Sequence, residues 1–147
     1  MPDLPEGLPV ERAFALDAAR HLSLFGRYPG ILARPDRWIS WWLGAVPAGL
    51  RLISRYRPSA IWSTYPIATA HVIGATLSKL SSLPWVADFR DPMVRPGYPS
   101  DPKTWRSFQR VEASAARDGR RCVFVARGTL QKYRERFRAQ LSQLPAR

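Results

Sequence analysis

The sequence predicts an α/β protein with a doubly wound parallel sheet. Three short apolar runs, each typical of a buried strand, alternate with stretches in which apolar residues recur at helical spacing. Because helices separate these runs, successive strands are expected to be parallel and joined by right-handed crossovers. The chain has 147 residues, which is enough for one domain with a single core.

The expected strands are short and end at turn or loop residues. Tyr65 and Pro66 follow the first strand. A polar, proline-rich loop follows the second strand and reaches Asp101, and loops of this length often carry function. The three expected strands are AIWST (60–64), WVADF (85–89) and RCVFVA (121–126).

Helical periodicity and capping residues predict the helices around this sheet. Asp36 is the expected N-cap of a helix that begins near Trp38, and Pro47 is expected to kink or restart that helix. Asp101 followed by Pro102 predicts a second capped N-terminus. The expected helices span 10–24, 38–53, 67–82, 102–118 and 129–137.

Two groups of side chains indicate how these helices pack. Ala70, Gly74 and Ala75 are small, so the helix over 67–82 is expected to lie close on the sheet. Three tryptophans, at positions 38, 41 and 42, are expected to pack in the core or at an interface rather than to form a stacking platform. Residues 1–35 contain five prolines and are loosely specified, so the expected domain occupies residues 36–140.

The composition limits the classes of function. The chain carries 23 Lys and Arg against 11 Asp and Glu, a formal net charge of +12. This charge would attract anionic lipid, nucleic acid or phosphorylated ligands, but it is spread along the chain, which favours a solvated basic surface without a dedicated polyanion partner. No apolar run has the length of a membrane span, and the N-terminus lacks the pattern of a signal peptide. We therefore expect a cytoplasmic protein.

The sequence offers little to a metal ion or a reactive thiol. Cys122 is the single cysteine and lies in the apolar run CVFVA, so we expect a buried, unreactive thiol. His71 falls within an expected helix and is expected to be a packing residue, and no metal-ligand spacing occurs.

Candidate site residues follow the expected strands, because ligands bind beyond the carboxyl ends of the strands in open parallel sheets. The second strand is followed by the richest group, in which Asp88 and Asp91 flank Arg90. Strand alternation would direct Asp88 and Arg90 to one side and Asp91 to the other. The group fits a substrate-binding site and, equally well, a local ion-pair network that orders the loop.

The other two strand ends offer weaker candidates. Ser63, Thr64 and Tyr65 follow the first strand. After the third strand, Arg127, Gly128 and Thr129 lead into a helix whose N-terminus could hold an anion, with Thr129 as its cap. One glycine is neither a phosphate-binding loop nor a dinucleotide fingerprint.

Several of these segments resemble a known family. The runs RPSAIWSTYPIATAHVIG and LPWVADFRDPM, a helix containing Glu112, and a basic helix ending in YRERF resemble the N-terminal, acceptor-side domain of family 4 glycosyltransferases over residues 35–137. The resemblance implies the GT-B architecture, in which two Rossmann-like domains face each other across a cleft. It also implies transfer of a sugar from a nucleotide-sugar to an acceptor, with retention at the anomeric carbon.

The resemblance assigns roles to particular residues. It implies that Ser63, Thr64, Tyr65, Asp88, Arg90 and Asp91 face the substrate. Many relatives have a histidine after the second strand, where this chain has Asp88 and Arg90, so no catalytic residue is assigned. A nucleotide-sugar donor is expected for the complete enzyme, with no further cofactor and no metal. The acceptor would be a sugar or a lipid-linked sugar.

The chain also departs from the family. No glycine-rich loop precedes Pro35, and no second domain follows. We therefore expect an incomplete Rossmann-like domain that is inactive without its C-terminal donor-binding domain.

An alternative function follows from the charge alone. The chain would then be a small basic module that binds an anionic membrane surface or, less favoured, nucleic acid. Both functions are compatible with a peripheral position on the inner face of the membrane. The residues expected to form this surface are Arg127, Lys132, Arg134, Arg136 and Arg138.

Overall fold

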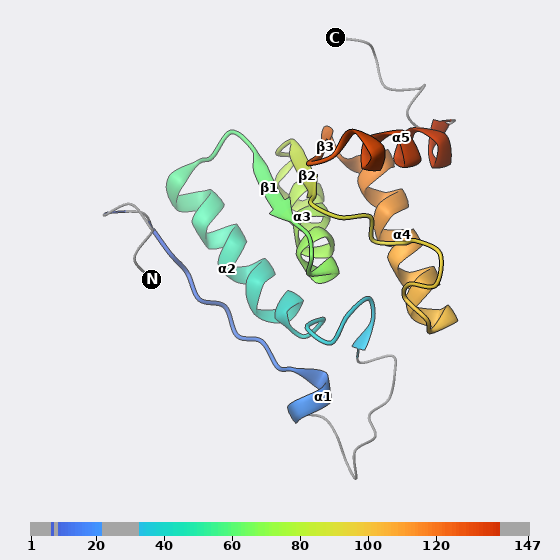
Figure 1. Cartoon of the computed structure of the whole chain (residues 1–147). Coiled ribbons are helices and arrows are strands. Elements are labelled where there is room, and N and C mark those ends of the chain that lie inside the picture. The colour runs from blue at the N-terminus through green and yellow to red at the C-terminus, as the bar shows by residue number, and fades with distance from the viewer. Residues whose placement is uncertain (1–6, 8, 22–32, 139–147) are drawn as a thin grey trace.

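The computed structural model describes residues 7, 9–21 and 33–138, and it shows helices packed on a small parallel sheet (Figure 1). The strands and most of the helices lie close to their expected places. In chain order the elements are α1 (Ala18–His21), α2 (Trp41–Tyr56), β1 (Ile61–Thr64), α3 (Ala68–Ser81), β2 (Trp85–Phe89), α4 (Pro102–Asp118), β3 (Arg121–Phe124) and α5 (Arg127–Arg136).

The sheet has three strands in the order β1-β2-β3, and both pairs are parallel. Trp85 lies opposite Ile61, and Asp88 lies opposite Thr64. All three carboxyl ends therefore meet at one edge of the sheet, as the alternation of strands and helices predicted. The α/β class is confirmed, and a Rossmann-like fold is matched only coarsely.

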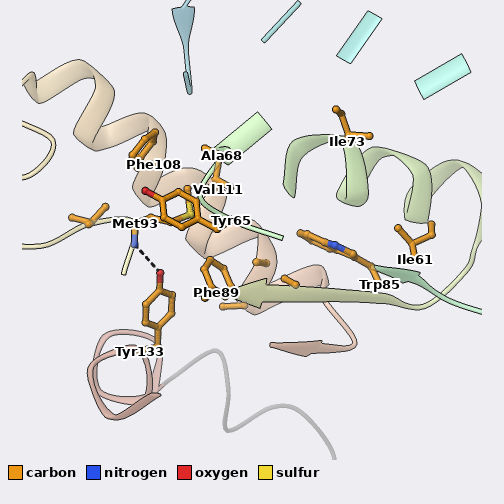
Figure 2. Close-up of a cluster of buried hydrophobic side chains, with 14 of the residues drawn as sticks. Ile61, Tyr65, Ala68, Ile73, Trp85, Phe89, Met93, Phe108, Val111 and Tyr133 are labelled. Atoms are coloured by element: carbon orange, nitrogen blue, oxygen red, sulfur yellow. Dashed lines mark hydrogen bonds between the residues drawn. The ribbon is translucent and has the colours of Figure 1, made fainter. Parts of the chain in front are cut away.

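One face of the sheet is buried under helices. Figure 1 shows α3 behind the strands, α4 packs beside α3, and α5 packs beside β3. The side chains that point to this face form the core with those of the helices, and Figure 2 shows Trp85 and Phe89 of β2 among them. Both are 1% exposed. The Phe89 ring lies 4.9 Å from that of Tyr133 and 5.5 Å from that of Phe124.

The opposite face of the sheet is largely uncovered by the described residues. Trp62 of β1 is 61% exposed, and Val86 and Val123 are half-buried at the neighbouring positions. Parallel sheets are normally buried on both faces. The second layer of helices that a doubly wound sheet carries is therefore not seen in the part of the chain that the structure describes.

Gly74 sets how closely α3 approaches the sheet. A Cβ atom at this position would lie 2.6 Å from Trp85 Nε1 and 2.9 Å from Ser63 Oγ. Any side chain at this position would therefore clash with these two atoms, which are hydrogen-bonded to each other at 2.8 Å. The prediction that a small residue lets this helix lie close on the sheet is confirmed at Gly74.

The helix α2 packs on α3 and runs through Pro47 without interruption. The predicted restart at this proline is therefore wrong, and the Pro47 ring is exposed. Trp41 and Trp42 pack against the core, as predicted, and Trp42 Nε1 donates to Thr76 Oγ1 at 2.9 Å.

Asp36 caps a different helix from the one predicted. The helix α2 begins at Trp41, and no side chain caps it. Asp36 Oδ1 accepts from Trp38 N in the preceding turn, while Asp36 Oδ2 accepts from Thr69 N at 2.7 Å in the first turn of α3. Thr69 Oγ1 also donates to Asp36 at 2.9 Å. This carboxylate thus ties the chain before α2 to the N-terminus of α3.

The remaining boundaries are mostly confirmed. Asp101 caps α4 by accepting from Thr104 N at 2.7 Å, as predicted. The cap predicted at Thr129 is wrong, because α5 already begins at Arg127 and Thr129 is buried inside it. The helix predicted over 10–24 is also wrong in extent, since residues 9–17 are not helical and only α1 follows. Residues 22–24 lie outside the described chain.

We predict that Asp36→Ala lowers the free energy of unfolding by about 1–2 kcal/mol, because it leaves the first turn of α3 without its acceptor. Urea denaturation measures this change. Glu135→Ala, which removes an exposed carboxylate from α5, is the matched control and should change stability by less than about 0.5 kcal/mol. Equal effects of the two substitutions would show that the capping role is wrong.

Candidate functional site

The carboxyl edge of the sheet brings together part of the predicted group of site residues. Thr64 and Asp88 lie side by side on the uncovered face, and both are half-buried. Tyr65 N donates to Asp88 O at 3.0 Å and so extends the pairing by one residue. A ligand at this edge would meet a hydroxyl and a carboxylate from adjacent strands.

Ser63 and Tyr65 point to the covered face instead. Ser63 is 7% exposed and Tyr65 is 4% exposed. Tyr65 packs edge to face on Phe108 of α4, with ring centroids 6.4 Å apart, and Figure 2 shows it among the core residues. The expectation that both face a substrate conflicts with this burial, which follows from the alternation of side chains along β1.

Ser63 belongs to a buried hydrogen-bond network. Trp85 Nε1 donates to Ser63 Oγ at 2.8 Å, and His71 Nδ1 lies 2.7 Å from the same oxygen. The assignment that satisfies Ser63 has its hydroxyl donating to Nδ1, which leaves the proton of the neutral ring on Nε2. His71 Nε2 has no hydrogen-bond partner among the described residues. Burial lowers the pKa of His71 to about 4, so the ring is neutral at physiological pH.

Arg90 and Asp91 follow β2 at the surface. Both side chains are exposed, and neither they nor Asp88 form an ion pair with any described residue. This geometry does not support the local ion-pair network that the spacing left open. The three charged groups remain available to a ligand at the carboxyl edge of the sheet.

A tight turn brings a second tyrosine to this edge. Arg95 and Tyr98 exchange backbone hydrogen bonds of 3.0 and 2.9 Å, and Gly97 adopts φ +75°, which glycine tolerates best. The pKa of Tyr65 is raised by burial and by the neighbouring Tyr98 and Asp91. Tyr98 itself is 44% exposed, so it adds a phenol to the rim of the site.

A buried carboxylate holds the loop that carries these residues. Glu112 of α4 is fully buried, accepts from Tyr133 Oη at 2.5 Å and Val94 N at 3.1 Å, and pairs with Arg136. Arg136 also donates to Val94 O at 3.1 Å. Burial raises the pKa of the Glu112 carboxyl, and the hydrogen bonds from Tyr133 and Arg136 oppose this rise.

The loop is fastened at a second point by the same tyrosine. Met93 N donates to Tyr133 Oη at 3.3 Å, the bond that is dashed in Figure 2. The side chains of Met93 and Val94 are at most 2% exposed. The loop after Asp91 is therefore held against both α4 and α5.

The residues predicted to form a basic surface lie on or next to α5. Arg127, Lys132, Arg134 and Arg138 are exposed on or next to α5. Arg136, predicted for the same surface, is also exposed, and its guanidinium pairs with Glu112. The Glu112 carboxylate is fully buried and therefore needs such a partner.

Sequence reasoning missed the Glu112 network, although a signal for it exists. Glu112 falls within the apolar stripe of α4, between Val111 and Ala115, where a carboxylate must find partners. The partners Tyr133 and Arg136 come from another helix, and their spacing in the sequence does not reveal the contact.

The structure adds little to the question of metals and thiols. No group of three or more His, Cys, Asp or Glu side chains able to hold a metal occurs within the described residues. Cys122 was predicted to be buried and is half-buried, and its burial raises the pKa of the thiol to about 11. Among the described helices, none has the length and apolar character needed to cross a membrane.

Comparisons of this chain with protein-family models, with curated proteins and with solved structures gave no match. The assignment of function therefore depends on the geometry of the chain itself.

We predict that Tyr133→Phe lowers the free energy of unfolding by about 1–3 kcal/mol, because it removes a hydrogen bond to a buried carboxylate. Amide hydrogen exchange at Met93 and Val94 should accelerate at the same time. Tyr56→Phe removes an exposed hydroxyl from α2 and is the matched control. Unchanged exchange at these two amides would contradict the role of Tyr133 in holding the loop.

We predict that His71 makes the protein less stable in acid. Its pKa falls from 6.5 to about 4 on folding, so between these values the unfolded chain binds a proton that the folded chain excludes. The stabilisation is present above pH 6.5 and is lost as the pH falls toward 4, by a total of about 3 kcal/mol.

Urea denaturation at several pH values tests this effect. His71→Gln cannot titrate in this range, so the difference in stability between wild type and variant should change by about 3 kcal/mol between pH 6.5 and 4. If the stabilities of wild type and of His71→Gln changed with pH in the same way, His71 would not be the group responsible.

Proposed function

We propose that the chain is the acceptor-side part of a sugar transferase, with the acceptor bound at the carboxyl ends of β1 and β2. One observation carries the proposal: Asp88, Arg90 and Asp91 lie together at this edge and form no ion pair with described residues. Carboxylates and a guanidinium can accept from and donate to the hydroxyl groups of a sugar. The carboxyl edge of a parallel sheet is also where ligands bind in this class of fold.

The architecture supports the proposal in a coarser way. The resemblance of WVADFRDPM and STYP to family 4 glycosyltransferases implies a Rossmann-like domain of the GT-B class. In this proposal the sheet is one part of that domain, and the exposure of Trp62 on its second face agrees with a layer that other residues would cover.

The proposal includes a second domain that binds the nucleotide-sugar donor. Transfer requires donor and acceptor to be held together, with charges placed where the transition state develops them. The described residues form one side of such a site. We therefore propose that this chain binds the acceptor and transfers sugar only when a donor-binding domain faces it.

The alternative function, binding to an anionic membrane surface through α5, has weaker support. Arg127, Lys132, Arg134 and Arg138 are exposed there, but Arg136 is engaged by Glu112. This surface adds to the sugar-transfer proposal rather than replacing it, because a peripheral enzyme with a lipid-linked acceptor would use both.

We predict that the chain binds sugars weakly at the sheet edge. Saturation-transfer NMR with a panel of mono- and disaccharides should detect this contact. Arg90→Ala and Asp91→Ala should each weaken binding by about fivefold or more, since each removes a charged hydrogen-bonding group. Arg120→Ala, an exposed arginine at the amino-terminal end of β3, is the matched control.

The same variants test transfer itself. When a donor-binding domain is supplied, wild type should release nucleoside diphosphate in the presence of an acceptor sugar, and Arg90→Ala and Asp91→Ala should reduce this rate. Equal turnover of these variants and of Arg120→Ala would remove the proposed role of the strand-end group.

A further inference from the structure

A second candidate site lies between α3 and α4, away from the sheet edge. Two cavities adjoin there and share Arg34, Ser107 and Arg110 among their lining residues. Their volumes are about 400 and 450 Å³. Each lies within the range of roughly 300–1,000 Å³ that small-molecule sites occupy. None of the residues of the proposed acceptor site lines either cavity.

Of the described residues that line the outer cavity, all but Ser107 are cations. Lys103, Arg106 and Arg110 follow one another at spacings of three and four along α4, so they share one face of the helix. Arg34 faces them from the segment that precedes α2. No Asp or Glu of the described chain lines this cavity, and none of the four cations forms an ion pair with a described residue.

The nearby carboxylates are engaged elsewhere. The charge of Arg34 contributes to lowering the pKa of Asp101. The Asp101 carboxylate is nevertheless engaged at the N-terminus of α4, where it accepts two hydrogen bonds from Thr104. Asp118 pairs with Arg117 and Lys79 at the far end of α4. Residues 22–32, which precede this part of the chain in the sequence, contain no Asp or Glu. Like charges at these spacings repel one another, so a bound anion would stabilise this face.

The inner cavity differs from the outer one in character. Its lining includes Ile39, Val72, Ala75 and Val111, with Trp85 at the start of β2. An aromatic or aliphatic group would fit here, next to the cationic cavity. The two cavities together match a molecule with an anionic head and an apolar body.

Two unsatisfied polar atoms border this space. His71 lines the inner cavity, is fully buried, and has no hydrogen-bond partner for Nε2 among the described residues. Arg34 lines both cavities, and its buried Nε also has no partner there. Buried polar groups are almost always hydrogen-bonded, so two such donors beside one cavity indicate a ligand that accepts from them.

We propose that the space between α3 and α4 binds a phosphate ester with an apolar body, its phosphate held by Arg34, Lys103, Arg106 and Arg110. Guanidinium groups suit a phosphate because they donate pairs of hydrogen bonds to its oxygens. The ligand is a phosphorylated small molecule or the headgroup of a phosphatidic lipid, which share this chemistry. The site does not depend on the sugar-transfer proposal.

Isothermal titration calorimetry with phenyl phosphate tests the proposal on the intact chain, with inorganic phosphate as the comparison at equal ionic strength. Phenyl phosphate should bind more tightly than inorganic phosphate. The double substitution Arg106→Gln with Arg110→Gln should weaken its binding by about tenfold or more. Lys132→Gln with Arg134→Gln removes the same charge from α5 and should weaken it by less than about threefold.

Two further measurements examine the inner cavity. Ala75→Phe should fill it, and should therefore weaken phenyl phosphate while leaving inorganic phosphate unchanged. Circular dichroism confirms that each variant is folded. The side-chain NMR signal of His71 should shift on addition of phenyl phosphate, and that of His21 should not.

Vesicles distinguish the two sources of phosphate. Retention on vesicles containing phosphatidic acid that is lost with Arg106→Gln and Arg110→Gln assigns the site to a lipid headgroup, while binding of phenyl phosphate alone assigns it to a soluble ligand. Equal losses in both double variants, or no binding of any probe, would overturn the proposal. Equal affinity for inorganic and phenyl phosphate would overturn the apolar part of the site.

Discussion

A buried carboxylate in α4, Glu112, connects three parts of the chain that are distant in the sequence. It accepts from the backbone of Val94 and from Tyr133, and it pairs with Arg136. Removing any partner would leave a charge or a polar group buried without compensation, which is far more costly than losing a surface contact. The loop after β2, α4 and α5 therefore depend on one another, and the position of the candidate acceptor site depends on all three.

The two proposed sites use different parts of the same architecture. Asp88, Arg90 and Asp91 are neighbours at the end of β2, and the topology of the sheet places Asp88 beside Thr64 of β1. The phosphate site lies between α3 and α4, where helix periodicity places Arg106 and Arg110 on one face. The first site is open and polar, whereas the second combines cations with an apolar cavity. Sugar hydroxyls suit the first site, and a phosphate ester suits the second.

The sequence predicted the fold best where local chemistry is decisive. WVADF matches β2 residue for residue, and Asp101 caps α4 as expected, because both signals come from neighbouring residues. Predictions failed where a distant contact competes. Asp36 caps α3 rather than α2, since Thr69 offers a donor that only the folded chain brings near. The pairing of Arg136 with Glu112 was not predicted for the same reason, because Glu112 lies on another helix.

The sequence by itself determined the α/β class, the alternation of strands and helices along the chain, and the charged residues at the end of β2. These features follow from periodicity and composition, which act over a few residues. Only the tertiary structure decided that Ser63 and Tyr65 turn inward, that Asp88 faces the uncovered side, and that His71 borders a cavity. Contacts between helices and strands decide which side chains are buried and which atoms form hydrogen bonds. The positions of these residues in the sequence do not reveal such contacts.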